Sequence, residues 1–264
     1  MANKNIKVCI LTGYGINTDY EMYSAFKLVG GLPERIHINF LINNPVILDQ
    51  FSIVVIPGGF SFGDHVGSGT ILASLLRIKL GNYLQKVINR GSLILGVCNG
   101  FQVLVKMGFL PSIHNAEQTV TLVHNESGKF EDRWISVEFN KKSPCLWTNG
   151  IEEMELPVRH GEGRIIMTKD VLADIEKYNL CPIRYSKKGV IHKKNLNVLP
   201  YPSNPNGSIN NIAGLCDTTG QVFGLMPHPE AFLYRFHHPR WRNELLVHEN
   251  ALEIFRNAVN YTSL

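Results

Sequence analysis

The sequence predicts an α/β fold with a mainly parallel central sheet and an antiparallel extension, and two observations support this prediction. First, short apolar runs alternate with amphipathic segments up to about residue 110, which is typical of parallel strands joined by right-handed helical crossovers. Second, from about residue 112 the apolar segments follow one another as strand-like runs, which favours hairpins or an antiparallel extension. Because no internal repeat interrupts the 264 residues, we expect one domain, residues 1–264, with the extension as a flap.

The elements of the first half follow from their apolar patterns. Apolar runs predict strands at residues 6–11, 37–42, 52–56 and 92–97. A helix is expected after Thr18 or Asp19, either of which can cap it, because apolar residues then recur at helical spacing over residues 22–29. Amphipathic helices are expected at residues 72–87 and 99–106.

The second half contains more strands and longer polar loops. Apolar patterns predict strands at residues 119–123, 134–139, 154–158, 164–167 and 221–226. Polar loops rich in proline, asparagine or lysine are expected at residues 187–194 and 200–211. A last helix is expected within residues 245–259, where leucine, phenylalanine and valine recur at helical spacing.

Composition and charge exclude several classes of function. A net charge of +4 without a basic block gives no support to nucleic-acid binding. No window approaches the ~18 apolar residues of a membrane helix, and the first residues lack the features of a signal peptide. Five scattered cysteines form neither a disulfide framework nor a CxxC metal pair. We therefore expect a cytoplasmic protein without a membrane, nucleic-acid or metal partner.

Cys98 lies in the stretch LGVCNGFQ, where a predicted buried strand turns into a predicted helix. Ligands of open α/β sheets bind at the carboxyl ends of strands, and Gly96 and Gly100 allow a tight turn like the nucleophile elbow of hydrolases. A helix N-terminus stabilises a thiolate by only ~0.3–1 kcal/mol, so a reactive thiol also needs a cationic imidazole. Since cysteine is a common core residue, this local context alone leaves a nucleophile and a core thiol equally supported.

His228 and Glu230 in GLMPHPEAF can supply that imidazole and its carboxylate. Residues i and i+2 of an extended segment project to the same side, and the flanking prolines restrict the backbone. A carboxylate beside an imidazole fixes its tautomer and stabilises the imidazolium, as in a catalytic triad. The alternative is a solvated surface turn.

The stretch VIPGGFSFGD follows another predicted strand and offers main-chain N–H groups. If this strand neighbours the one before Cys98, the N–H groups of Gly59 and Asn99 can form an oxyanion hole. Two nucleotide motifs are excluded: GxxxxGK[ST] does not occur, and the GYG at residues 13–15 has Thr18 where a dinucleotide fingerprint requires its third glycine.

These residues together resemble the class I glutamine amidotransferases. Within that family, the phrases PGGFSFGD, CNGFQVL, RHGEGR and NPNGSINNIAG are similar to the glutaminase subunits of phosphoribosylformylglycinamidine synthase, in order over about residues 7–230. The resemblance implies a flavodoxin-like sandwich. It also implies hydrolysis of glutamine through a glutamyl thioester, with ammonia passed to a partner synthase that makes formylglycinamidine ribonucleotide in purine biosynthesis.

The resemblance also implies roles for individual residues. Cys98 would be the nucleophile, His228 the general base and then acid, and Glu230 its orienter, with Gly59 and Asn99 as the oxyanion hole. Gln102, His160 and Gly161 would lie around the amino-acid end of glutamine. The partners implied are the large, ATP-using chain of the synthase and, as an open alternative, a small third subunit. No cofactor or metal is expected on this chain.

The sequence departs from the family pattern at three places. Many members have Asn-Cys-Asp where this chain has Asn17, Thr18 and Asp19, so no cysteine acts there. The loop at residues 187–198 and the segment after Glu230 are longer than in compact members.

Two other functions remain open at this point. A related cysteine hydrolase, peptidase-like or deglycase-like, would turn over peptides or other substrates in place of glutamine. A non-catalytic subunit would serve only as a scaffold for a synthase, although Cys98, His228 and Glu230 speak against it. For the Asn-rich stretch at residues 204–211, a packed internal loop and a synthase-docking surface are equally supported.

Overall fold

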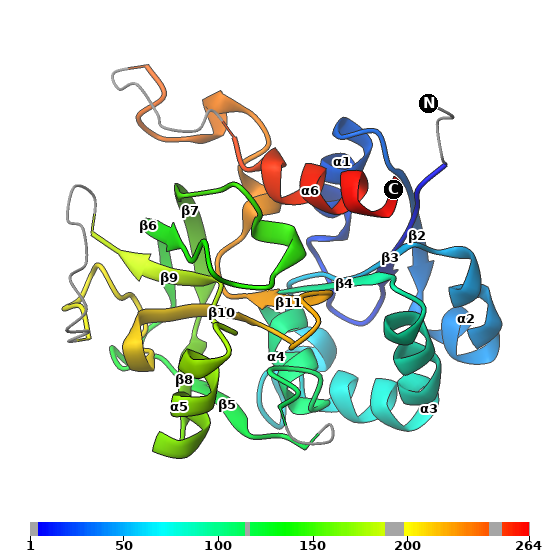
Figure 1. Cartoon of the computed structure of the whole chain (residues 1–264), viewed down its shortest axis with the longest axis horizontal. Coiled ribbons are helices and arrows are strands. Elements are labelled where there is room, and N and C mark those ends of the chain that lie inside the picture. Colours follow the sequence, from blue (N-terminus) through cyan, green and yellow to red (C-terminus); the bar gives the residue numbers. More distant parts are fainter. Residues whose placement is uncertain (1–4, 114–116, 188–197, 243–249, 264) are drawn as a thin grey trace.

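The central sheet of the protein is half parallel and half antiparallel. The computed structural model describes residues 5–113, 117–187, 198–242 and 250–263 (Figure 1). Within these residues, nine strands form one sheet in the order β2-β1-β3-β4-β11-β10-β9-β6-β7. The pairs from β2 to β11 are parallel and the pairs from β11 to β7 are antiparallel. The predicted α/β fold with an antiparallel extension is confirmed.

Most strands lie close to the predicted runs, but no strand was predicted at residues 32–36, 183–186 or 212–216. The parallel half contains β1 (Lys7–Thr12), β2 (Leu32–His37), β3 (Ile53–Ile56), β4 (Leu93–Val97) and β11 (Val222–Leu225). The antiparallel half contains β10 (Ile212–Cys216), β9 (Ile183–Ser186), β6 (Glu131–Phe139) and β7 (Glu153–His160). A separate antiparallel pair consists of β5 (Val120–His124) and β8 (Glu162–Met167). Residues 119–123 and 134–139 are therefore strands, but they pair with other segments and not with each other.

Helices cover both faces of the parallel half (Figure 1), and its strands are buried except for the edge strand β2. The helices are α1 (Asp19–Leu28), α2 (Ile38–Asn43), α3 (Thr70–Asn89), α4 (Asn99–Lys106), α5 (Lys169–Lys177) and α6 (Leu252–Ser263). The helices α1 and α6 pack together through Phe26 and Phe255, whose ring centroids are 5.2 Å apart. The helices α3 and α4 lie on the other face of the sheet (Figure 1). β3 and β4 are fully buried, as expected for parallel strands covered on both faces.

The prediction of a strand at residues 37–42 is wrong. The strand β2 ends at His37, and α2 begins at Ile38. His37 ends the strand because its Nδ1 accepts the Asn39 N–H at 3.2 Å and so caps the helix. Ile38 and Leu41 then occupy the buried positions of one helical face, a spacing that a short apolar run does not distinguish from a strand.

Two predicted elements lie partly outside the described residues. Of the loop at 187–194, only Lys187 is described, and of the last predicted helix only residues 250–259, in which α6 begins at Leu252. In the part of the chain that the structure describes, no helix is both long enough and apolar enough to cross a bilayer.

Candidate active site

The candidate site lies where three neighbouring strands of the parallel half end. β4 pairs with β3 on one side, where Gly96 lies opposite Ile56, and with β11 on the other, where Val97 lies opposite Leu225. The segments that follow these three strands carry the Pro-Gly-Gly turn, Cys98 and His228. Parallel strands thus bring together three motifs that are far apart in the sequence.

Cys98 occupies the turn between β4 and α4 in a strained conformation. Its φ is 51° and its ψ is −106°, which a residue with a side chain rarely adopts. Its Sγ lies 3.6 Å from the Arg159 carbonyl oxygen, and 6% of the residue is exposed. Gly100 is required next to it, because a Cβ there would lie 1.8 Å from the Ile56 carbonyl oxygen. The structure therefore holds the thiol at a helix N-terminus, at the wall of a pocket.

His228 and Glu230 form a buried pair beside Cys98. The Nδ1 of His228 and the Oε1 of Glu230 are 2.6 Å apart, and both side chains are nearly inaccessible to solvent. Because the carboxylate accepts a hydrogen bond, Nδ1 carries a proton. The Nε2 of His228 has no hydrogen-bond partner among the described residues. This atom is therefore free to exchange a proton with a group in the pocket.

The charges around His228 keep its imidazole protonated. Burial alone would lower its pKa, but the negative charges of Glu230 and then of Cys98 outweigh burial and raise the pKa to about 10. The imidazolium can therefore stabilise a thiolate at Cys98, as the sequence argument requires of a reactive cysteine.

The Pro-Gly-Gly turn and the start of α4 both present main-chain N–H groups near Cys98. Neither the Gly59 N–H nor the Asn99 N–H meets an acceptor within the described residues. Gly59 has a φ of +145°, and a Cβ there would lie 2.3 Å from the Gly15 carbonyl oxygen, so only glycine fits. Both N–H groups are thus available to a ligand, as an oxyanion hole requires.

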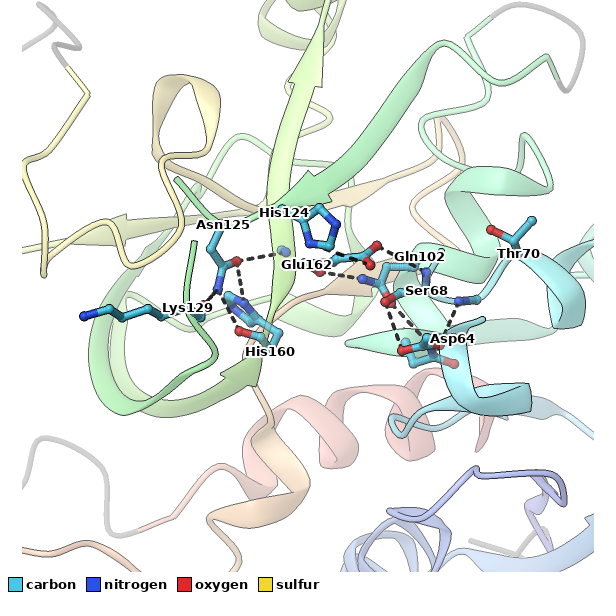
Figure 2. A network of polar contacts seen from close by, with 12 residues as sticks. Asp64, Ser68, Thr70, Gln102, His124, Asn125, Lys129, His160 and Glu162 are labelled. Atoms are coloured by element: carbon cyan, nitrogen blue, oxygen red, sulfur yellow. Dashed lines mark hydrogen bonds and ion pairs between the residues drawn. The ribbon is translucent and has the colours of Figure 1, made fainter. Parts of the chain in front are cut away.

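Gln102 connects the helix after Cys98 to the antiparallel extension. Its Nε2 donates to the Glu162 carbonyl oxygen, and its Oε1 accepts from the Asn99 side chain at 3.3 Å. Glu162 in turn accepts the Ser68 N–H at 3.2 Å, and Ser68 donates to Asp64 at 3.0 Å (Figure 2). Burial raises the pKa of Asp64. Gln102 lines the pocket, and its amide is already hydrogen-bonded to the protein.

His160 lies at the end of β7, next to the pocket, and its ring is held by Asn125. The Nδ1 of His160 is 3.0 Å from the Asn125 Oδ1, which also accepts the Gly163 N–H at 3.1 Å (Figure 2). Asn125 donates from its Nδ2 to the His160 carbonyl oxygen at 2.7 Å, which fixes the orientation of the amide. Burial, aided by the charge of His228, lowers the pKa of His160 to about 3. The ring is therefore neutral, with its proton on Nδ1.

A pocket of about 170 Å³ brings these predicted residues together with several that were not predicted as site residues. Of the predicted set, Gly59, Cys98, Gln102, His160, Gly161 and His228 line it. Glu230 reaches it only through His228, and Asn99 lies next to Cys98. The additional lining residues are Asn17, Thr18, Phe60, Asp64, Ser68, Phe130, Arg159 and Glu162. Four of them, Phe60, Asp64, Arg159 and Glu162, belong to the motifs PGGFSFGD and RHGEGR, whereas Asn17, Thr18, Ser68 and Phe130 lie outside both motifs.

The structure favours the internal alternative for the Asn-rich stretch. Asn206 is completely buried, and its Nδ2 donates to the Gly163 carbonyl oxygen at 2.9 Å and to the Tyr185 hydroxyl at 3.0 Å. Asn204 accepts the N–H groups of Gly207 and Ser208 at 3.0 and 3.2 Å. Asn206 is therefore not an exposed docking amide. Its hydrogen bonds hold the loop that supports β8 beneath the pocket.

Within the described residues, no group of three or more histidine, cysteine or acidic side chains could hold a metal ion. The chemistry that the arrangement of Cys98, His228 and the two N–H groups supports is attack by a thiolate, with proton transfer through an imidazole and charge stabilisation by main-chain donors.

Comparison with known proteins identifies relatives over almost the whole chain. Residues 5–262 match the family described as a CobB/CobQ-like glutamine amidotransferase domain. The phosphoribosylformylglycinamidine synthase subunit PurQ of Dehalococcoides mccartyi is 44% identical over 257 residues, which are 97% of each chain. The protein of the same name from Thermotoga maritima is 32% identical over 97% of each chain.

Solved structures show the same similarity. A chain in the structure of PurLQS from Thermotoga maritima matches with a TM-score of 0.72 and 28% identity, over 97% of this chain and 99% of that chain. A glutamine amidotransferase from Thermotoga maritima matches with a TM-score of 0.52 and 14% identity, over 90% of this chain and 80% of that chain. At that identity the second match shows a shared fold alone.

Proposed function

The chain belongs to the CobB/CobQ-like glutamine amidotransferase family, and from this premise we propose that it hydrolyses glutamine and supplies the ammonia to a phosphoribosylformylglycinamidine synthase. The observation that carries the proposal is the placement of Cys98 and the His228–Glu230 pair at the ends of adjacent strands, in one pocket. We assign this activity to a single domain that spans residues 1–264.

The first half of the reaction transfers the glutamyl group to Cys98. The thiolate attacks the side-chain amide carbon of glutamine, and the carbonyl oxygen gains the negative charge. The Gly59 and Asn99 N–H groups, which meet no other acceptor among the described residues, stabilise that oxygen. His228 gives its Nε2 proton to the amide nitrogen, the carbon–nitrogen bond breaks, and ammonia leaves. A glutamyl thioester remains on Cys98.

The second half of the reaction releases glutamate. His228, now neutral, takes a proton from a water molecule, and the resulting hydroxide attacks the thioester carbon. The carbon–sulfur bond breaks and Cys98 leaves as a thiolate beside the imidazolium. Glu230 stabilises the imidazolium through its 2.6 Å contact with Nδ1 and keeps Nε2 directed toward the reacting atoms. Gln102, His160 and Gly161, which line the same pocket, surround the amino-acid end of glutamine.

The ammonia is used by a second protein. The curated relatives are named as subunits of phosphoribosylformylglycinamidine synthase, and the similar solved chain belongs to a structure named PurLQS. This chain has no GxxxxGK[ST] motif. The ATP-dependent step that converts formylglycinamide ribonucleotide to formylglycinamidine ribonucleotide therefore belongs to a large partner subunit, with a small third subunit in the assembly.

The test separates glutamine hydrolysis from the use of ammonia. In the complex with its synthase, Cys98→Ala should abolish product formation from glutamine but leave product formation from added ammonium salts unchanged. Cys145→Ala, which removes another buried thiol outside the pocket, is the matched control and should retain both activities. Glutamine-dependent activity near that of the wild type in Cys98→Ala would overturn the assignment.

A further inference from the structure

Thr18 stands at the start of α1 but does not cap that helix. A threonine at this position usually accepts an N–H from the first turn of its own helix, and Thr18 makes no such bond. Its Oγ1 accepts instead the N–H of Gly58, at 2.9 Å and 40 residues away in the chain. Thr168, at the start of α5, shows the ordinary arrangement, because its hydroxyl accepts the Val171 N–H. The Thr18 hydroxyl therefore holds another segment of the protein.

That segment is the Pro57-Gly58-Gly59 turn: the Gly58 N–H belongs to its first peptide, and the Gly58 carbonyl belongs to the second peptide, which presents the Gly59 N–H. The Gly58 carbonyl oxygen accepts the N–H groups of Asn17 at 3.2 Å and Thr18 at 3.4 Å, and the Thr18 hydroxyl lies 3.4 Å from the same oxygen. The carbonyl of Gly58 and the N–H of Gly59 belong to one planar trans peptide, so they point in opposite directions. Because these hydrogen bonds hold the Gly58 carbonyl toward Thr18, the Gly59 N–H points away from Thr18.

The turn packs closely against both Thr18 and His228. A Cβ on Gly58 would lie 2.9 Å from the Cε1 of His228 and 3.3 Å from the Thr18 Oγ1, so this glycine is confined between the two residues. Thr18, Gly59, Cys98 and His228 line the same pocket. A shift of the turn would therefore change where the Gly59 N–H lies relative to the thiol.

We propose that Thr18 is a positioning residue, whose hydroxyl holds Gly58 on both its N–H and its carbonyl oxygen and so fixes the turn in which the Gly59 N–H meets the oxyanion formed when Cys98 attacks its substrate. The inference rests on the proposed glutaminase function, because only an acyl-transfer reaction forms such an oxyanion. In this role, Thr18 touches neither the substrate nor the reacting atoms. It acts through the turn.

The test compares Thr18→Val, which removes the hydroxyl at nearly constant size, with Thr18→Ser, which keeps it. Loss of an oxyanion donor lowers kcat by about 10²–10³, and a misplaced donor should cost less. In the complex with the synthase, Thr18→Val should therefore lower kcat for glutamine by about 10- to 100-fold with KM changed less than about threefold. Thr18→Ser should stay within about threefold of the wild type, and Thr168→Val, the matched control, should not change kcat.

Alkylation of Cys98 by iodoacetamide distinguishes positioning from general disruption of the site. This reaction displaces iodide at a saturated carbon and forms no oxyanion, so its rate in Thr18→Val should equal that of the wild type. An unchanged kcat in Thr18→Val, or a loss of alkylation as large as the loss of kcat, would overturn the proposal. The Cys98→Ala variant, measured in the same assay, distinguishes failure of the proposed function from failure of the proposed role of Thr18. If Cys98→Ala retains glutaminase activity, the proposed function is contradicted, whatever the result for Thr18→Val.

Discussion

At the scale of single residues, the pocket contains two buried histidines whose pKa values are shifted in opposite directions. Burial lowers the pKa of His160 to about 3, and the charge of His228 adds to this effect. Burial also opposes the charge of His228, but Glu230 and Cys98 raise its pKa to about 10. The two histidines differ in the partner of their Nδ1 atom. His228 has the carboxylate of Glu230 at 2.6 Å, whereas His160 has the neutral amide of Asn125. This difference explains why the imidazole of His228 is charged and that of His160 is neutral.

The pair of His228 and Glu230 predicts a pH-dependent stability. The pKa of His228 is raised from 6.5 to about 10, so the folded state binds this proton more tightly than the unfolded state does. The resulting stabilisation is fully present below pH 6.5 and is lost as the pH rises through about 10. Since Glu230→Gln removes the charge that raises this pKa, it should lower the free energy of unfolding more at about pH 6 than at about pH 10. Urea denaturation at both pH values measures the difference.

The control for this prediction is Glu153→Gln, which removes an exposed carboxylate from β7. Its effect on the free energy of unfolding should be small at both pH values. An equal loss at both pH values in Glu230→Gln would show that Glu230 stabilises the fold through packing and not through the charge of His228.

At the scale of elements, the close contact between α4 and β3 determines where Cys98 lies. A Cβ on Gly100 would lie 1.8 Å from the Ile56 carbonyl oxygen, so Gly100→Ala must push the first turn of α4 away from the sheet. We expect this change to lower the free energy of unfolding by more than about 3 kcal/mol and to abolish glutamine hydrolysis. Chemical denaturation and the glutaminase assay measure the two effects.

Gly81→Ala is the matched control within α3, because nothing lies within 4 Å of a Cβ at that position. Alanine is favoured over glycine inside a helix by about 1 kcal/mol, so this variant should be as stable as the wild type or more stable. A similar loss of stability in both variants would contradict the prediction, because it would show that the contact with Ile56 is not what makes Gly100→Ala destabilising.

The Asn-rich loop provides a further prediction at this scale. Asn206 donates two hydrogen bonds and accepts two more from Ser208, at 3.1 Å from its N–H and 2.7 Å from its hydroxyl. Asn206→Ala removes these four buried hydrogen bonds and should lower the free energy of unfolding by about 2–3 kcal/mol, although the Ser208 N–H keeps Asn204 as an acceptor. Asn210→Gly, which preserves a backbone with a φ of 47° in the same loop, should cost less. A stable Asn206→Ala protein with weakened binding to the synthase would instead restore the docking alternative.

At the scale of the whole molecule, the sequence predicted the parts of the site that depend on local patterns. The turn at Cys98 was predictable because an apolar strand and a helix meet there. The pair of His228 and Glu230 was predictable because residues i and i+2 of an extended segment project to the same side. The contact between Thr18 and Gly58 was not predictable, because threonine before a helix normally acts as its cap. The approach of Glu162 to Ser68 was not predictable either, because it depends on how the antiparallel extension lies against the parallel half.

That approach supports the last prediction, which concerns how the two halves of the molecule close the pocket. Two hydrogen bonds join them at Glu162, whose carbonyl accepts from Gln102 and whose carboxylate accepts the Ser68 N–H at 3.2 Å. Glu162→Ala removes the second bond and should loosen the wall of the pocket without touching Cys98. We therefore expect KM for glutamine to rise by about 3- to 10-fold while kcat changes less than about threefold.

Steady-state kinetics with the synthase complex measures this split, and two variants serve as controls. Glu162→Gln keeps an acceptor oxygen for the Ser68 N–H and should lie between the wild type and Glu162→Ala. Glu153→Ala removes an exposed carboxylate of the same extension, outside the pocket, and should leave both constants unchanged. A large loss of kcat at constant KM in Glu162→Ala would contradict a role in closing the pocket. It would place the carboxylate in the reaction itself, since only an interaction specific to the transition state changes kcat alone.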